Sequence, residues 1–160
     1  MRSILFAVIG VLVATATYAD VTLTSEEGRF TAQVPVNPVI THEVTLNPMH
    51  QPITTYHFHM EDGGVTYNIS YADGVGETPS DVYQDIAPVC KQISDAIPIK
   101  AGGVEGIFFT GTLGSDYWYN YHVYQKGGRL YYIFIFAPKL EDFGRAQIEI
   151  KALNDSFDMS

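Results

Sequence analysis

Three things are scarce in this chain of 160 residues, and each scarcity excludes a class of protein. The single cysteine, Cys90, cannot form an internal disulfide, so the fold must be held together by its core. Lys and Arg number 9 against 18 Asp and Glu, and the formal charge of −9 disfavours binding to nucleic acid or to anionic lipid. No apolar run reaches the roughly 20 residues that a membrane-spanning helix needs.

The first 19 residues have the order of a secretory signal peptide. Arg2 supplies the positive charge, residues 4–13 form the apolar region, and small residues precede Ala19. Cleavage after Ala19 leaves residues 20–160, a single domain that begins at Asp20 and has no membrane anchor. We therefore predict an exported protein, periplasmic or extracellular, with a formal charge of −10 once Arg2 is lost from the 9 basic residues.

Alternating apolar and polar residues predict a series of strands after the signal peptide. The segments with this period-two pattern, or with strand composition between turn residues, are 21–23, 29–34, 40–46, 53–60, 65–71, 104–113, 118–125 and 129–137. Residues 130–137 are apolar on both faces, which is typical of a central strand covered on two sides. The pair Gly127-Gly128 predicts a hairpin turn between the last two strands, and the glycines at 102 and 103 are interpreted as turn residues.

Two helices are predicted by their start signals. Thr78 is a good N-cap, Pro79 suits the first helical position, and Asp81 is placed to complete a capping box. Pro88 lies within the apolar pattern that follows, so it should kink or split this helix. A final helix begins after Pro138, and its apolar stripe consists of Phe143, Ala146, Ile150 and Leu153, continued by Phe157. Strands followed by helices predict an α+β domain, a mainly antiparallel sheet packed by helices on both sides.

Three short segments of the chain form a recognisable set. They are Gly28-Arg29-Phe30 with Val34-Pro35, then Gly128-Arg129-Leu130-Tyr131-Tyr132, and finally Asn154-Asp155-Ser156-Phe157. With these segments the chain resembles the PsbP-like superfamily of small exported proteins. The resemblance implies an α/β/α sandwich and a non-catalytic role in binding or assembly outside the cytoplasm. It supplies no catalytic residues.

Four histidines, His42, His50, His57 and His59, form the strongest candidate for metal chemistry, because imidazole with nearby thioether sulfur suits copper. If Leu46 faces Ile53, His42 joins His57 and His59 on one side of the sheet. Burial of the apolar residues instead favours a register in which Leu46 faces Thr54, which directs His42 inward. His57 and His59 are then the only candidate ligands for copper or zinc, with weak affinity expected.

Catalytic motifs are not evident. The chain has no Gly-x-Ser-x-Gly elbow to place a nucleophilic serine. His122 and Asp116 could supply only the histidine and the acid of a hydrolase site. We interpret Cys90 as a small core residue. We therefore expect no enzymatic activity and no cofactor.

The hairpin of residues 118–137 has two aromatic faces. One face, with Tyr119, Tyr121 and Val123, is predicted to be core. The other face needs a cover, which is either the final helix or a partner that binds Trp118, Tyr124 and Tyr131. We favour the helix, because the sandwich architecture covers both faces.

The functional prediction is a non-catalytic binding or assembly module with an unknown protein partner or small ligand. The alternatives are a copper- or zinc-binding factor and a small hydrolase. The sheet face that carries His57 and His59 decides between them: an open pocket with convergent donors favours chemistry, and a flat polar face favours the module.

Overall fold

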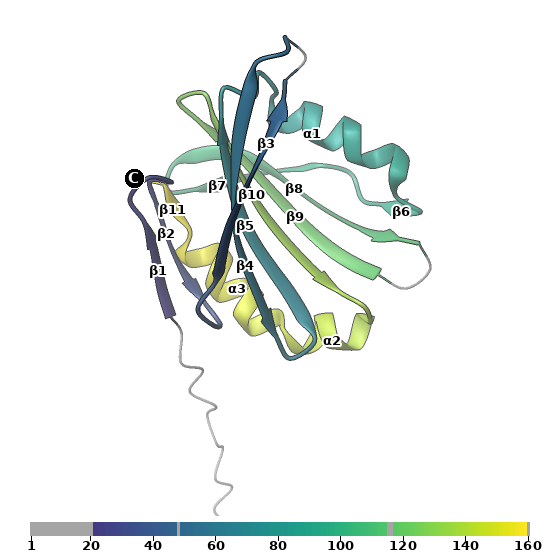
Figure 1. The fold of residues 1–160 in the computed structure, drawn as a ribbon. Coiled ribbons are helices and arrows are strands. Elements are labelled where there is room, and N and C mark those ends of the chain that lie inside the picture. Colours follow the sequence, from purple (N-terminus) through teal and green to yellow (C-terminus); the bar gives the residue numbers. More distant parts are fainter. Residues whose placement is uncertain (1–20, 48, 115–116, 160) are drawn as a thin grey trace, which may run out of the picture.

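The computed structural model describes residues 21–47, 49–114 and 117–159. A large antiparallel sheet of eight strands has the order β3-β4-β5-β10-β9-β8-β6, with β7 also paired to β8 (Figure 1). Its strands are β3 (Val39–Leu46), β4 (Pro52–Asp62), β5 (Val65–Asp73), β6 (Gln92–Ile93), β7 (Ile97–Ala101), β8 (Val104–Leu113), β9 (Tyr117–Lys126) and β10 (Arg129–Ala137). A second sheet, of order β1-β2-β11, consists of β1 (Val21–Ser25), β2 (Phe30–Val34) and β11 (Asp158–Met159).

The helices lie on opposite sides of the large sheet. They are α1 (Pro79–Ile86), the 3₁₀ turn η1 (Ala87–Val89), α2 (Leu140–Arg145) and α3 (Gln147–Ser156). One core cluster joins β4, β5 and β10 to α3 and the small sheet. A second cluster joins β8, β9 and β10 to α1. The α+β class, with a mainly antiparallel sheet packed by helices, is therefore confirmed.

The capping box at the start of α1 forms as the sequence predicts. The Thr78 hydroxyl accepts a hydrogen bond from the backbone N–H of Asp81, and the Asp81 carboxylate accepts one from the backbone N–H of Thr78 at 2.8 Å. The helix ends at Ile86, and the chain passes through η1 at Pro88, so the proline splits the helix. The predicted apolar stripe does not continue on an α-helix beyond this point, since Val89 ends η1 with an exposed side chain and Ile93 belongs to β6.

The final helix is divided into α2 and α3 at Ala146, where φ is −80° and ψ is 5°. Its predicted stripe faces the core, and Ala146, Ile150, Leu153 and Phe157 are all buried. The short strand β11 then pairs with β2, which places the C-terminal segment beside the N-terminal hairpin (Figure 1). The sequence did not indicate β6, β7 or β11, because each is too short or too irregular to alternate visibly.

The register of β3 on β4 differs from the predicted one. Leu46 faces Pro52, two residues earlier than the predicted Thr54. The physical reason is a tight loop closed by Asn47, whose side-chain oxygen accepts hydrogen bonds from the N–H groups of Met49 at 3.0 Å and Gln51 at 2.9 Å. Because the shift is an even number of residues, every side chain stays on its predicted face.

Strand β3 is an exposed edge. All eight of its residues are exposed, including Ile40, Val44 and Leu46.

Among the residues that the structure describes, none of the helices has the length and apolar composition that a membrane span requires.

Candidate functional site

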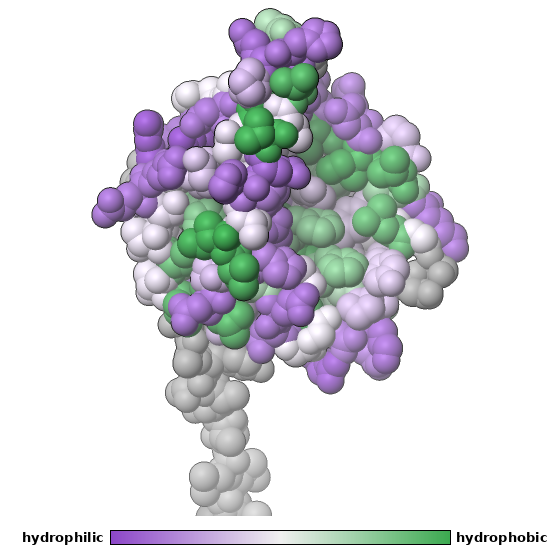
Figure 2. Space-filling view, in the orientation of Figure 1, coloured by the Kyte–Doolittle hydropathy of each residue, from purple (hydrophilic) through white to green (hydrophobic). Residues whose placement is uncertain are grey.

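The face of the large sheet that packs against α1 is only partly covered. Helix α1 covers Phe109, Tyr119, Val123 and Leu130, which form the buried part of this face. Beyond the helix, four aromatic side chains stay half-buried: Tyr121, Tyr132, Phe134 and Phe136. We call Tyr121, Tyr132, Phe134 and Phe136 the aromatic floor. Figure 2 shows a hollow with apolar side chains in it between the β3–β4 edge and the region of α1.

Strand register brings polar side chains to the edge of the aromatic floor. Ser70 in β5 faces His57 in β4 on one side and Tyr132 in β10 on the other. In the next row, Asn68 faces Phe134, which in turn faces Tyr121. The resulting hollow has a volume of about 220 Å³ and is lined by Thr55, His57, Asn68, Ser70, Tyr121, Tyr132 and Phe134.

The polar wall of this hollow is a hydrogen-bonded group. The Nδ1 atom of His57 lies 2.8 Å from the Oγ atom of Ser70, and the side-chain amide of Asn68 donates to the same oxygen at 3.0 Å. The Glu43 carboxylate lies 3.6 Å from Nε2 of His57. The Oδ1 atom of Asn68 is buried and has no hydrogen-bond partner among the described residues, so an acceptor is left for a ligand that donates.

A second hollow extends the first along the same face. It has a volume of about 210 Å³, shares Thr55 and Tyr132 with the first, and ends at Glu77. Burial, and then the nearby Asp85 and Asp81 charges, raise the pKa of the Glu77 carboxyl. Burial also raises the pKa of the Tyr132 phenol, helped by Glu77. The two hollows form one groove, which we call the sheet groove, with hydrogen-bonding groups along an aromatic surface.

The His57 and Ser70 pair has one element of a hydrolytic site and lacks another. A serine hydroxyl beside an imidazole nitrogen is the nucleophile and base arrangement of acyl transfer. Ser70 lies in the middle of β5, however, between β4 and β10, so its backbone N–H belongs to the sheet ladder. The donor beside Ser70 is the Asn68 amide, which already bonds to the serine oxygen. This arrangement is suited to hydrogen bonding more than to stabilising an oxyanion.

The structure separates the histidines. His42 lies on the face of Tyr56, with 5.9 Å between ring centroids, but is exposed because β3 extends beyond the core. His57 and His59 share the opposite face of β4, and the Nε2 atom of His59 lies 3.4 Å from Glu61. Within the described ranges, no group of three or more His, Cys, Asp or Glu side chains is arranged to hold a metal ion.

The candidate partner-binding residues of the aromatic hairpin are placed in or near the core. Tyr124 and Tyr131 are each 2% exposed and pack against Phe157, so they are not available to a partner. Trp118 is half-buried. The predicted register is correct, with Lys126 facing Arg129, and the face of Tyr124 and Tyr131 is covered by the C-terminal segment. The opposite face, predicted to be core, is the one left partly open.

Cys90 is half-buried, with its Sγ atom 2.6 Å from the hydroxyl of Tyr119 and 3.2 Å from the carbonyl oxygen of Ile86. It is therefore a packing residue that directly follows η1.

Ser70 and Phe134 were not predicted as parts of a site. In the sequence, these residues show only the alternation of polar and apolar positions that is ordinary for strands such as β5 and β10.

Comparison with known proteins identifies the fold. No family model matches the sequence, and no curated protein matches it. Among solved structures, the chain is similar to the solution structure of cyanobacterial PsbP (CyanoP) from Synechocystis sp. PCC 6803, with a TM-score of 0.57 and 10% sequence identity. The match covers 95% of this chain and 99% of that chain. The fold is PsbP-like. The predicted resemblance is thereby confirmed at the level of the fold.

The segments that carried the resemblance meet in the core of this PsbP-like fold. Phe30 lies 5.5 Å from Phe157 and 6.5 Å from Tyr131, measured between ring centroids. The Arg129 guanidinium donates to the carbonyl oxygen of Glu27, next to Gly28. These segments therefore hold the N-terminal hairpin, β10 and the C-terminal helix together. The second segment also contributes Tyr132 to the lining of the sheet groove.

Proposed function

We propose that the protein is an exported, non-catalytic binding module of PsbP-like type that holds a ligand or partner segment in the sheet groove. The observation that carries the proposal is the half-buried aromatic floor beside the His57, Ser70 and Asn68 group. Aromatic side chains left open to solvent and bordered by polar groups are typical of binding sites. The predicted signal peptide supports the exported location.

The ligand should have an apolar or aromatic surface and a hydrogen-bond donor at one edge. The donor is required by the unpaired Oδ1 atom of Asn68, and the apolar surface by Tyr121 and Phe134, whose ring centroids are 4.8 Å apart. Glu43 and Glu77 add negative charge near the groove, which disfavours an anionic ligand.

A small hydrolase is the second candidate function, favoured by the 2.8 Å distance between His57 and Ser70 and by the hollow that these two residues line. It ranks second because the neighbouring donors are already engaged and the Ser70 backbone lies in the sheet ladder.

The proposal is tested by capture from the exported fraction, with bound molecules identified by mass spectrometry. We expect wild-type protein to retain a ligand or partner that Phe134→Ser loses. A matched control is Ile148→Ser, since Ile148 is exposed on α3, away from the groove. Thermal melting of each variant checks that the fold is kept. Equal capture by wild type and Phe134→Ser would show that the groove is not the binding site.

A further inference from the structure

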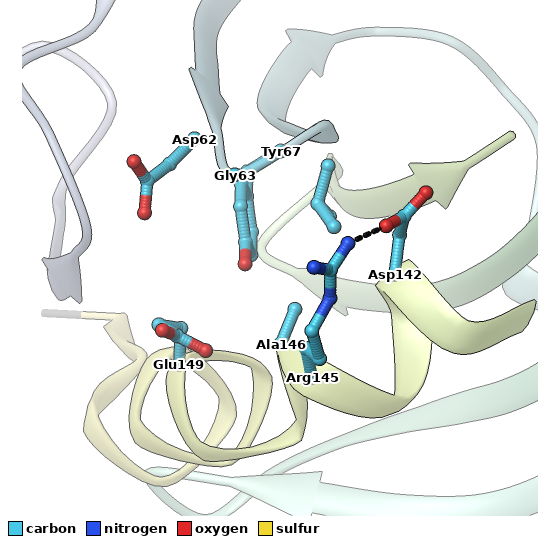
Figure 3. A pocket seen from close by; sticks show the side chains of 8 residues that line it. Asp62, Gly63, Tyr67, Asp142, Arg145, Ala146 and Glu149 are labelled. Carbon is cyan, nitrogen blue, oxygen red and sulfur yellow. Dashed lines mark hydrogen bonds and ion pairs between the residues drawn. The ribbon is translucent and has the colours of Figure 1, made fainter. Parts of the chain in front are cut away.

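A third hollow lies on the other side of the molecule, between the β4–β5 hairpin and the helices. The hairpin contributes Asp62, Gly63, Val65 and Tyr67, the helices contribute Asp142, Arg145, Ala146 and Glu149, and the volume is about 180 Å³. Figure 3 shows Asp62 and Glu149 on one side of the Tyr67 ring and the Arg145–Asp142 pair on the other. We call this hollow the acidic pocket.

The charges in the acidic pocket do not balance. Three carboxylates, those of Asp62, Asp142 and Glu149, line it together with one guanidinium, that of Arg145. Arg145 pairs with Asp142 (Figure 3). In the described part of the chain, neither Asp62 nor Glu149 has an ion pair, so two negative charges remain without a cation.

Glu149 is the unusual member of this group. The residue is only 7% exposed, and its Oε2 atom is buried with no hydrogen-bond partner among the described residues. A buried carboxylate is normally paired or hydrogen-bonded, because an unmatched one loses its hydration without compensation. Glu149 lines the pocket directly, so a cationic donor placed there would supply what its carboxylate lacks.

We propose that the acidic pocket binds an organic cation, a guanidinium or alkylammonium group, through Glu149 and Asp62. A metal ion is disfavoured, because the described residues hold no cluster of three suitable ligands. The pocket has the size of a long basic side chain, and Tyr67 lines it between the two carboxylates and the Arg145–Asp142 pair (Figure 3). This site is separate from the sheet groove, so either proposal can fail without the other.

The experiment is a titration of the labelled full mature chain with methylguanidinium, followed by amide chemical shifts in NMR. We expect saturable shifts at Gly63, Gly64 and the start of α3. Methylurea, which has nearly the same shape and no charge, should cause none. Glu149→Gln and Asp62→Asn should each weaken binding about ten-fold or more, whereas Glu141→Gln, an exposed acid on α2, should not.

Two further arms define the source of the cation and the direction of the effect. A short peptide with one central arginine should shift the same amides if the natural ligand is a protein side chain, and n-butylammonium should do so if it is a small amine. Arg145→Ala should tighten binding, because it removes the one cation from the pocket and frees Asp142.

Several results would overturn the proposal. They are the absence of shifts with every cation, equal shifts with methylurea, and saturable shifts with calcium but not with methylguanidinium. Asp62 is half-buried at the end of β4, so Asp62→Asn keeps the test decisive if Glu149→Gln does not fold.

Discussion

The imidazole of His57 and the hydroxyl of Ser70 face each other across β4 and β5, with 2.8 Å between Nδ1 and Oγ. This relationship forms part of the polar wall of the sheet groove, and it also resembles a catalytic pair. A Ser70→Ala variant separates the two roles.

We expect no hydrolysis that depends on Ser70. The mature protein should release p-nitrophenol from p-nitrophenyl acetate at the same rate as its Ser70→Ala variant, because Ser70 lacks a free backbone N–H donor beside it. Rates are measured by absorbance at equal protein concentrations. A loss of about a hundred-fold in kcat/KM in Ser70→Ala would support the hydrolase instead.

Arg129 should contribute strongly to stability. It is buried, donates to both carboxylate oxygens of Asp73 at 2.7 and 2.5 Å, and also bonds the Glu27 carbonyl oxygen in the β1–β2 turn. Arg129→Lys cannot keep this geometry and should lower the free energy of unfolding in urea by about 2 kcal/mol. As a control, Lys100→Gln breaks an exposed pair with Glu105 and should change it by less than about 0.5 kcal/mol. Equal effects of the two substitutions would refute this role.

The stabilisation that the Arg129–Asp73 pair provides should depend on pH. Hydrogen bonds from Arg129 hold the pKa of Asp73 below its ordinary value of 3.8. The contribution of this pair is therefore complete above pH 3.8 and is lost as the pH falls through the lowered pKa.

His122 should make the fold sensitive to mild acid. Burial lowers the pKa of His122 from 6.5 to about 4, and neither ring nitrogen has a hydrogen-bond partner among the described residues. The unfolded chain therefore binds a proton near pH 6.5 that the folded chain does not bind until about pH 4, so stability falls as the pH falls through this window. The loss should be about 3 kcal/mol.

Urea unfolding at a series of pH values tests this assignment. His122→Phe should flatten the dependence between pH 6.5 and 4, whatever its effect on stability at neutral pH. His42→Gln is the control, because His42 is exposed on β3 and should leave the wild-type dependence unchanged. A dependence in His122→Phe as steep as in wild type would rule out His122 as its origin.

Export is predicted from the first 19 residues, which lie outside the described residues. N-terminal sequencing of protein from the exported fraction should begin at Asp20. Ala19→Arg should block this cleavage, because the enzyme that removes signal peptides needs a small residue there. A stable cytoplasmic form that keeps Met1 would contradict the prediction.

Face assignment was predictable from the sequence, whereas coverage of each face was not. Tyr119 and Tyr121 show the difference, since they are the same residue type on the same face of β9. Tyr119 is 1% exposed and Tyr121 is half-buried. A period of two determines which side of a sheet a residue faces, but α1 is short and covers only one of the two positions.

Alternation in the sequence also did not predict the register of β3 on β4 or the shortest strands. The two-residue error between β3 and β4 arose from the side-chain hydrogen bonds of Asn47, which tighten a loop that alternation does not describe. The capping box of Thr78 and the split at Pro88 were predictable because each depends on neighbours in sequence. The site was predicted only in part: the sequence pointed to His57 and its sheet face, whereas Ser70 and Phe134 join it only through the pairing of three strands.

The most direct test of the central claim is photo-cross-linking from the sheet groove. The photoreactive residue p-benzoylphenylalanine replaces Phe134 in one sample and the exposed Ile148 in another, and each protein is irradiated in the exported fraction. We expect a discrete cross-linked species from position 134 that is absent from position 148. Cross-links from position 148 alone, or identical products from both positions, would contradict it.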